Sequence, residues 1–296
     1  MDVEKRLIII DGYSLLYRAF HALPPLTNKN GQPTGAVYGF LLILFKAIKD
    51  LKANYIVACF DTAKPTFRHE KFDDYKIHRP KMPDQIVLQI PIIKEVLKSF
   101  NIPIFEKEGF EADDLIATIA RNVEKNEDSE IYILSGDLDN LQLVDEKIKV
   151  YTLGKGIKDT VLYDRERIVN RFGVEPLQMN DFKALTGDNS DNVPGVPGIG
   201  KITAADLVQR FGSIENLYQE IATDTAVLKP KIKESLKANK EKAFLSLELV
   251  KTVQDMKIDF NLENCKFGNF DSQKVKNIFN ELNFNTLMDR LSTIIF

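Results

Sequence analysis

The chain has 296 residues, 44% of them hydrophobic and 28% charged, and a formal net charge of −3, a composition typical of a folded globular protein with one large core. No apolar run approaches the roughly 20 residues that a membrane-spanning helix requires, and the N-terminus lacks a signal-peptide pattern. The two cysteines, Cys59 and Cys265, exclude a disulfide framework and a cysteine-based zinc site and favour a reducing compartment, the cytoplasm.

The first half of the chain alternates short apolar runs with helix-length segments. Strands are predicted at 7–10, 55–60, 102–105, 131–134 and 148–151, and helices at 36–51, 84–100 and 112–123. Strands that alternate with helices indicate βαβ units, which build a mostly parallel sheet with helices on both faces. The pattern therefore predicts an α/β domain over residues 1–173.

Residues 62–83 interrupt this alternation. They carry three prolines and several aromatic residues, and the stretch from Lys64 to Lys81 has six lysines and arginines against three acids. A loop or short helix of this length inside a compact domain is often functional, although a solvated face of mixed charge is the alternative interpretation.

After Gly173 only helices are predicted, at 176–185, 203–211, 214–221 and 241–253. Ser213 has the residue type and position of an N-cap for the third of them. We therefore expect a helical module over 174–255, followed by a C-terminal segment at 256–296 that packs on the α/β domain.

Acidic residues follow several of the predicted strands. The first, second and fourth strands lead into acids, and the third leads to a helix that opens with three more. The carboxyl ends of parallel strands share one edge of an open sheet, where ligands bind, so these side chains should be neighbours. They are Asp11, Asp61, Asp137, Asp139, Glu111, Asp113 and Asp114.

Taken singly, each acid could be a turn residue or could stabilise a helix N-terminus. Together they repel: two carboxylates about 4 Å apart cost roughly 4 kcal/mol at an effective dielectric near 20. Six or more would exceed a net stability of about 5–15 kcal/mol unless cations neutralise them. Oxygen ligands without histidine or cysteine suit Mg²⁺ or Mn²⁺, and two such ions can drive phosphodiester cleavage. The acids therefore predict a metal-dependent nuclease.

A glycine turn follows the α/β domain. The segment 185–204 adds Asp188 and Asp191 and then places Gly198 and Gly200 just before the helix that is predicted to begin near Thr203. Backbone N–H groups at a helix N-terminus favour a phosphate and do not read base sequence. A purely structural hairpin is the alternative for this turn taken alone.

These motifs together resemble the 5′-nuclease, or flap endonuclease, superfamily. The likeness is greatest to the 5′–3′ exonuclease domain of bacterial DNA polymerase I and its free-standing relatives, and it covers nearly the whole chain. The motifs that carry it are DGYSLLYRAF at 11–20, PTGAVYGF at 33–40, CFD at 59–61, TFRHE at 66–70, DYKIHRPKMP at 74–83, FEADDLIATIA at 110–120, SGDLDNLQLV at 135–144 and TGDNSDNVPGVPGIG at 186–200.

The resemblance implies a PIN-like, resolvase-like nuclease domain followed by a helix–three-turn–helix (helix-hairpin-helix) module, with 62–83 as the arch beside which a single strand passes. It implies a first metal group of Asp11, Asp61, Glu111 and Asp113 with Asp114 beside them, and a second of Asp137, Asp139, Asp188 and Asp191. Lys76 and Arg79 match the basic pair that holds the scissile phosphate. DNA contacts are expected from Arg68, Tyr75, Lys81, Gly198, Gly200, Lys201 and Thr203.

Three positions depart from the common family pattern. Leu138 stands where lysine or arginine is usual, and His78 where asparagine is usual. Lys201 is displaced by one position from the usual hairpin lysine, so its phosphate contact is less firmly implied than the backbone contacts. None of these departures removes an expected metal ligand.

The sequence therefore predicts a Mg²⁺-dependent, structure-selective 5′–3′ exonuclease or 5′-flap endonuclease of replication and repair, acting in the bacterial cytosol or nucleoid. Its cofactors would be two divalent cations, Mg²⁺ or Mn²⁺, with K⁺ at the helical hairpin. Its partners would be DNA with single-strand/double-strand junctions, such as flaps and nicks, or RNA primers, and we expect a monomer. A PIN-like ribonuclease and a noncatalytic DNA-binding subunit are the alternatives. The sequence leaves open whether the chain is free-standing or the front of a polymerase.

Overall fold

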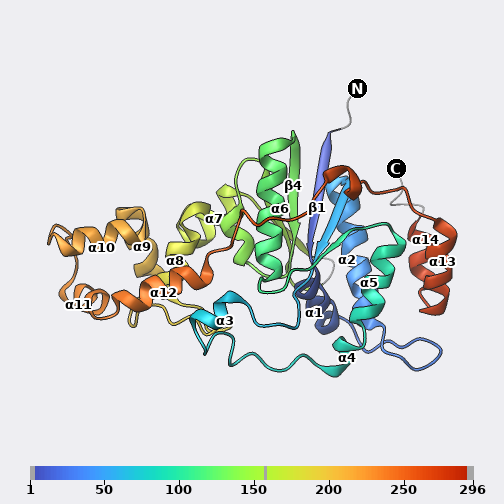
Figure 1. The fold of residues 1–296 in the computed structure, drawn as a ribbon, viewed down its shortest axis with the longest axis horizontal. Coiled ribbons are helices and arrows are strands. Elements are labelled where there is room, and N and C mark those ends of the chain that lie inside the picture. The colour runs from blue at the N-terminus through green and yellow to red at the C-terminus, as the bar shows by residue number, and fades with distance from the viewer. Residues whose placement is uncertain (1–3, 157–158, 292–296) are drawn as a thin grey trace.

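The computed structural model describes residues 4–156 and 159–291. Its centre is a six-stranded sheet in the order β3-β2-β1-β4-β5-β6 (Figure 1). The first five strands are parallel and β6 is antiparallel to β5, which confirms the expected mostly parallel sheet. The strands are β1 Lys5–Asp11, β2 Tyr55–Cys59, β3 Ile104–Phe105, β4 Ser129–Leu134, β5 Ile148–Leu153 and β6 Thr160–Tyr163.

Helices cover both faces of this sheet and also form a separate group at one end (Figure 1). Those before residue 173 are α1 Gly12–Ala22, α2 Gly35–Leu51, α3 Phe67–Lys71, α4 Asp84–Val87, α5 Ile90–Ser99, α6 Ala112–Asn126 and α7 Arg165–Phe172. Those after it are α8 Met179–Thr186, α9 Lys201–Phe211, α10 Ile214–Ala222, α11 Pro230–Ala238, α12 Lys240–Val250, α13 Ser272–Glu281 and α14 Asn285–Leu291. Short 3₁₀ helices lie at Asp139–Leu143, Pro176–Gln178 and Leu262–Cys265.

The strand β1 shows why both faces are covered. Successive side chains of a strand point to opposite faces, and from Leu7 to Ile10 both sets are apolar and fully buried. Leu7 and Ile9 join the core that includes α6 and the helical region, whereas Ile8 and Ile10 join the core that includes α1, α2 and α5. The sheet therefore separates two apolar cores, which cover its two faces and leave its carboxyl edge available for polar side chains.

The predicted helix at 84–100 is wrong in its continuity, because the segment forms two helices, α4 and α5. Pro91 lies in the first turn of α5, where a proline costs no hydrogen bond, but it could not continue a helix through α4. The side chain of Gln89, at the break, accepts the backbone N–H groups of Ala36 and Val37 at 2.8 and 3.2 Å. The break thus supplies a cap for the N-terminus of α2.

The structure contains several elements that the sequence analysis did not predict. They are the short strand β6 and the helices α1, α7, α11, α13 and α14. The helix α1 begins directly after the first acid, with Asp11 as its N-cap, so strand and helix meet without a loop. The short α3 lies inside the segment 62–83, where a loop or short helix was expected.

The helical region after residue 173 contains α8 to α12, and Ser213 caps α10 as expected, accepting the N–H of Asn216. The helix α12 ends three residues earlier than expected, at Val250, because the following residues make extended contacts with the α/β domain. The chain then returns to that domain (Figure 1). There Phe279 of α13 packs edge-to-face on Phe100. No helix within residues 4–156 and 159–291 has the length and apolar character to span a bilayer.

Candidate active site

The first two strands bring two aspartates to the same edge of the sheet. Asp11 ends β1, and its Oδ1 accepts the backbone N–H of Ser14 at 3.2 Å. Asp61 follows β2, and its Oδ1 accepts the backbone N–H of Ala112 at 2.8 Å, in the first turn of α6. Because Asp11 lies opposite Cys59 in the parallel register, both carboxylates reach the carboxyl edge, as expected.

The start of α6 and the turn after β4 add further acids to this edge. Glu111 is the N-cap of α6 and Asp113 lies in its first turn. The side-chain amide of Asn140 donates to Asp113 Oδ1 at 2.8 Å and so joins α6 to the turn that carries Asp137 and Asp139. The expectation that separate strands deliver their acids to one place is confirmed.

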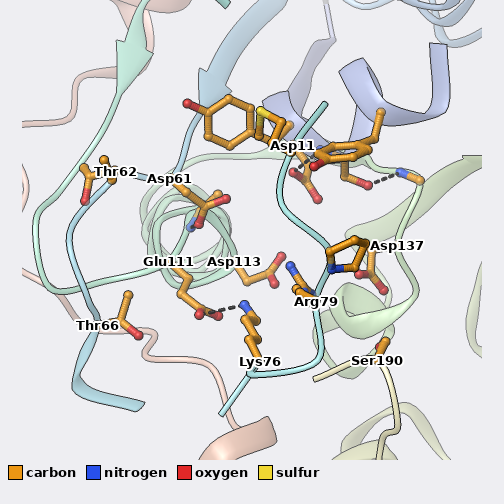
Figure 2. A pocket seen from close by; sticks show the side chains of 18 of the residues that line it. Asp11, Asp61, Thr62, Thr66, Lys76, Arg79, Glu111, Asp113, Asp137 and Ser190 are labelled. Atoms are coloured by element: carbon orange, nitrogen blue, oxygen red, sulfur yellow. Dashed lines mark hydrogen bonds and ion pairs between the residues drawn. The ribbon is translucent and has the colours of Figure 1, made fainter. Parts of the chain in front are cut away.

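These acids open into a cavity of about 920 Å³. Figure 2 shows five carboxylates, from β1, the end of β2, α6 and the turn after β4, turned toward one another with two basic side chains among them. We call this space the acidic cavity; its carboxylates are Asp11, Asp61, Glu111, Asp113 and Asp137, and its central basic residues are Lys76 and Arg79.

A second, much smaller recess adjoins the acidic cavity. It is lined by Glu111 and Asp113 and by three acids of the expected second group, Asp139, Asp188 and Asp191. Glu111 and Asp113 thus face both spaces, whereas Asp137, which was expected in the second group, lines the first. The expected division into two groups of four is therefore less sharp in the structure.

Three acids of the cavity, Asp11, Asp61 and Asp113, have a pKa above the usual range of a carboxylic acid. Burial, with the charges of Asp61 and Asp137, raises the pKa of Asp11 to about 7, although the hydroxyl of Ser135 donates to it at 2.7 Å. Burial and the charges of neighbouring acids also raise the pKa of Asp113 well above its usual range. Burial, reinforced by repulsion between neighbouring carboxylates, therefore disfavours the charged form of these acids.

Lys183, on α8, sits between two acids of the recess. It donates to Asp139 and, at 3.0 Å, to Asp188. Burial raises the pKa of Asp139 to about 6, and the Lys183 charge only partly opposes this. At Asp188 the Lys183 charge and a hydrogen bond from Ser190 outweigh burial and lower the pKa to about 2.

Lys76 and Arg79 place two positive charges at the mouth of the recess. Lys76 Nζ lies 2.7 Å from Glu111 Oε1, and Arg79 Nε lies 3.0 Å from Asp191 Oδ1 (Figure 2 draws the first contact). Lys76 has a left-handed backbone with φ of 58°, a conformation that is uncommon for a non-glycine residue. Its backbone N–H donates to the carbonyl of Asp191 at 2.9 Å, which holds this turn against the helical region.

The donor chemistry of the site fits divalent cations that prefer oxygen. Several carboxylates from four elements converge there, and burial together with repulsion raises the pKa of four of them, Asp11, Asp61, Asp113 and Asp139, above the usual range. Within the two described ranges, no three acids, histidines or cysteines surround a single point closely enough to hold an ion as they stand. Lysine and arginine side chains instead contact Glu111, Asp139, Asp188 and Asp191.

Asp114 does not join the other acids. It is fully buried, and Arg68 grips both its oxygens at 2.8 Å, so neither the cavity nor the recess is lined by Asp114. The position of Arg68 likewise does not support its expected DNA contact, because the residue is only 2% exposed. Tyr75 is also buried, with its hydroxyl donating to Glu111 and Asp191 at 3.2 and 3.3 Å. Tertiary contacts have turned these three residues inward.

The glycine turn lies away from the acids, at the start of α9. Gly200 is the N-cap of this helix, and Gly198 has φ of 80°, which glycine adopts without strain. Both glycines and Lys201 are exposed, and Thr203 is half-buried in the first turn. Lys81, in the segment 62–83, is 90% exposed at its side chain. The four exposed positions, Gly198, Gly200, Lys201 and Lys81, are open to a ligand, as the DNA-binding expectation requires.

Three polar residues of the site were missed from the sequence. Ser135 donates to Asp11, Asn140 donates to Asp113, and Lys183 bridges Asp139 and Asp188. Ser135 and Asn140 flank the two aspartates of the SGDLDN motif, which could have drawn attention to them. Lys183 precedes Asp188 by five residues on an ordinary helix, and only the packing of α8 against the sheet edge reveals it.

Comparison with known proteins agrees with this geometry. Residues 6–173 match the N-terminal resolvase-like domain of the 5′–3′ exonucleases, and residues 174–273 match their C-terminal SAM-fold domain. A 5′–3′ exonuclease of Aquifex aeolicus is 40% identical over 98% of this chain and 96% of its own length. DNA polymerase I of Bacillus subtilis is 42% identical over 98% of this chain, which spans about a third (33%) of the polymerase.

Solved structures share the fold. The 5′-exonuclease of T5 with bound zinc ions superposes with a TM-score of 0.70, at 22% identity, over 98% of this chain and 100% of that one. The catalytic core of Rad2 in complex with a DNA substrate gives 0.63, at 19% identity, over 99% and 93%. The family resemblance seen in the sequence is confirmed: the chain belongs to the 5′–3′ exonuclease family.

Proposed function

We propose that the protein is a structure-selective 5′–3′ exonuclease and 5′-flap endonuclease that hydrolyses DNA phosphodiester bonds with Mg²⁺. Membership of the 5′–3′ exonuclease family supplies the reaction class. The observation that carries the proposal is the acidic cavity, where five carboxylates from separate elements meet Lys76 and Arg79. Such a combination of bound cations and basic side chains would hold a phosphodiester and stabilise the charge that develops on it during hydrolysis.

Two divalent cations would be held by the acids of the cavity and the recess, Mg²⁺ being the expected ion and Mn²⁺ the second candidate. Bound there, they would supply a water of lowered pKa and charge stabilisation for the leaving oxygen. Asp11, Asp61, Glu111 and Asp113 would hold one ion, and Asp137, Asp139, Asp188 and Asp191 the other. Because Asp137 lines the first cavity and Glu111 and Asp113 face both, these three are the residues that would be shared.

Lys76 and Arg79 would bind the scissile phosphate. Each now contacts a carboxylate, Glu111 or Asp191, and a phosphate entering the cavity offers the same charge to the same donors. Both side chains belong to one short turn whose backbone is hydrogen-bonded to the helical region. The turn therefore places the two charges side by side. Their contribution would be greatest where charge develops on the phosphate oxygens.

The grip on duplex DNA would come from the glycine turn. The N–H groups at the start of α9 would meet a phosphate, with Lys201 and Thr203 beside them and a K⁺ ion as a further bridge. The segment 62–83, with Lys81 exposed, would lie along the single strand. Junctions such as flaps and nicks would then be preferred, in DNA or at RNA primers, by a monomer in the bacterial cytoplasm.

The test compares three 5′-labelled substrates: a DNA flap, a blunt DNA duplex and a single-stranded RNA. Each is incubated with Mg²⁺, with Mn²⁺ and with EDTA, and the products are sized on a denaturing gel. We expect Mg²⁺-dependent cleavage of the flap near its junction, slower attack on the blunt duplex, and none in EDTA.

Other outcomes would identify other functions. Faster cleavage of the single-stranded RNA than of the flap would favour the ribonuclease alternative. Binding of the flap without cleavage in either metal would favour a noncatalytic DNA-binding subunit and would reject the proposal.

A further inference from the structure

Arg68, the second residue of α3, donates four of its five guanidinium N–H groups to acceptors inside the protein. Nη1 and Nη2 each donate to Asp114 at 2.8 Å, Nε donates to the carbonyl of Leu249 at 2.8 Å, and Nη2 also reaches the carbonyl of Lys251 at 2.9 Å. The residue is only 2% exposed. Arg68 lines the small recess, but its donors are largely committed to acceptors of the protein, so its main role is an internal one.

Asp114 is equally committed. Its Oδ1 accepts from Arg68 and from the backbone N–H of Val253 at 2.9 Å, and its Oδ2 accepts from Arg68 and from the backbone N–H of Glu111 at 3.0 Å. Each oxygen thus has two donors, which uses the lone pairs that a metal ion would need. Asp114 is an internal acceptor and not a ligand.

The pair sits behind the acids that face the cavity. One residue of an α-helix corresponds to a rotation of about 100°, so Asp113 can face the cavity while Asp114 faces the interior. Asp114 holds the N–H of Glu111, the N-cap of α6, and Arg68 Nη1 lies 3.6 Å from Glu111 Oε2. Both members of the pair therefore fix Glu111 from the interior side: Asp114 through its backbone N–H and Arg68 through its carboxylate.

The same pair also joins three parts of the chain. Arg68 belongs to the segment 62–83 and Asp114 to the first turn of α6. Their other partners lie in the strap, by which we mean residues 249–253: the last two residues of α12 and the extended segment that leads back to the sheet. Later in the segment 62–83, Tyr75 and Lys76 contact Glu111 directly. Glu111 is thus held both from behind, through the Arg68–Asp114 pair, and from the cavity side.

Stability alone does not call for a charged pair at this place. Removing one partner of a buried pair is strongly destabilising, but replacing both by apolar residues of similar size is often tolerated. A buried guanidinium–carboxylate pair offers directional, two-pronged geometry that an apolar contact lacks. The structure therefore suggests that geometry is what the pair provides.

We propose that Arg68 and Asp114 are a positioning pair, which fixes Glu111 for divalent-cation binding by tying α3 and the strap at 249–253 to the start of α6. The pair touches neither cation nor DNA and acts through Glu111. The inference rests on the proposed function only where turnover is measured, because cation binding can be followed without DNA.

The test uses the double substitution Arg68→Met/Asp114→Val. A matched control is Lys71→Gln/Glu248→Gln, which removes an exposed ion pair, 2.6 Å long, that also joins α3 to the helical region. Thermal unfolding checks the fold, calorimetry measures Mg²⁺ affinity without DNA, and flap cleavage gives kcat and KM. We expect the pair variant to fold, to lose about 10–100-fold in Mg²⁺ affinity and in kcat, and to keep its KM for the flap. The control should match the parent protein.

A folded pair variant with parental Mg²⁺ affinity and kcat would overturn the proposal. An equal loss in the control would also overturn it, because docking of α3 would then suffice as the cause. If the double variant does not fold, Asp114→Asn, which keeps the shape and removes the charge, takes its place with the same criteria. If the parent protein cuts no DNA, the proposed function fails, while the calorimetric comparison still decides this inference.

Discussion

The acidic cavity and the glycine turn are the two places where the protein would meet DNA, and they are built in opposite ways. The cavity gathers side chains from four elements, and burial together with the charges of neighbouring acids raises the pKa of Asp11 to about 7. The turn offers backbone: a Cβ built on Gly198 or Gly200 would meet no atom within 4 Å. One site is defined by side-chain chemistry and the other by its openness.

This difference implies that the cavity determines the rate of cleavage and the turn determines the affinity for duplex DNA. Repulsion between the carboxylates raises the free energy of the metal-free protein, and a bound cation would relieve it. Such destabilised groups are expected at a site that performs chemistry. An open helix N-terminus holds a phosphate of any sequence and need not change during the reaction. Substitutions in the cavity should therefore lower kcat, and substitutions in the turn should raise the Kd for duplex.

The largest effect should come from Asp113→Asn in the cavity. Loss of one carboxylate that faces both the cavity and the recess should lower kcat on the order of 10³-fold. Removing a repelled charge should at the same time raise the Tm of the metal-free protein at neutral pH. Flap cleavage, DNA binding in EDTA and thermal unfolding would be measured together. Loss of DNA binding in parallel with kcat would contradict the division between the two sites.

Lys76→Met should have the next largest effect. The substitution keeps most of the side-chain volume and removes the charge that would hold the scissile phosphate, so kcat should fall on the order of 10²-fold. Lys81→Met, at a side chain that is 90% exposed, is the matched control and should change kcat little. Similar losses in single-turnover assays of both variants would show that general positive charge, and not placement, is what matters.

Gly198→Ala tests the turn. With φ of 80° and open space around it, a methyl group costs only backbone strain, about 1 kcal/mol, which the free turn can relieve by changing conformation, so the Kd for duplex DNA should weaken by up to roughly fivefold. Gly200→Ala is the control, because its φ of −90° suits alanine and its surroundings are equally open. Equal weakening of duplex binding, measured by fluorescence anisotropy, would mean that a methyl group obstructs the phosphate at either position.

The smallest effect should be a pH-dependent shift in stability. Because the pKa values of Asp11 and Asp139 are raised in the folded state, to about 7 and about 6, the folded protein binds more protons than the unfolded chain above pH 4. The metal-free protein should therefore lose stability as the pH rises from about 4 to about 7. Mg²⁺ should restore it, raising the Tm by a few degrees more at pH 8 than at pH 5.5. A Mg²⁺ effect independent of pH would place the ion away from these acids.

Much of the cavity could be foreseen from single stretches of sequence. The acids at positions 11, 61, 111, 113, 137 and 139 each follow or closely succeed a short apolar run, and parallel strands must bring such ends to one edge. The glycine turn could be foreseen for a similar reason, since its conformation and its helix are encoded within a few residues. Local patterns suffice wherever backbone geometry alone fixes the outcome.

Contacts between distant residues could not be foreseen in this way. The partner of Arg68 lies 46 positions away, and nothing in the TFRHE or FEADD motifs tells whether an exposed or a buried guanidinium results. The same is true of Lys183, which meets Asp139 across 44 positions. The break between α4 and α5 has a local cause, Pro91. The contact by which Gln89 caps α2 joins residues 53 positions apart, and the local sequence does not indicate it.

The sequence by itself determined the family, the alternation of strands and helices, and the set of carboxylates at the sheet edge, because these depend on periodicity, turn residues and the order of motifs. Only the tertiary structure decided which charged side chains face the cavity and which face the interior. Burial requires that each charge find a partner, and that partner is set by how elements far apart in the chain pack together.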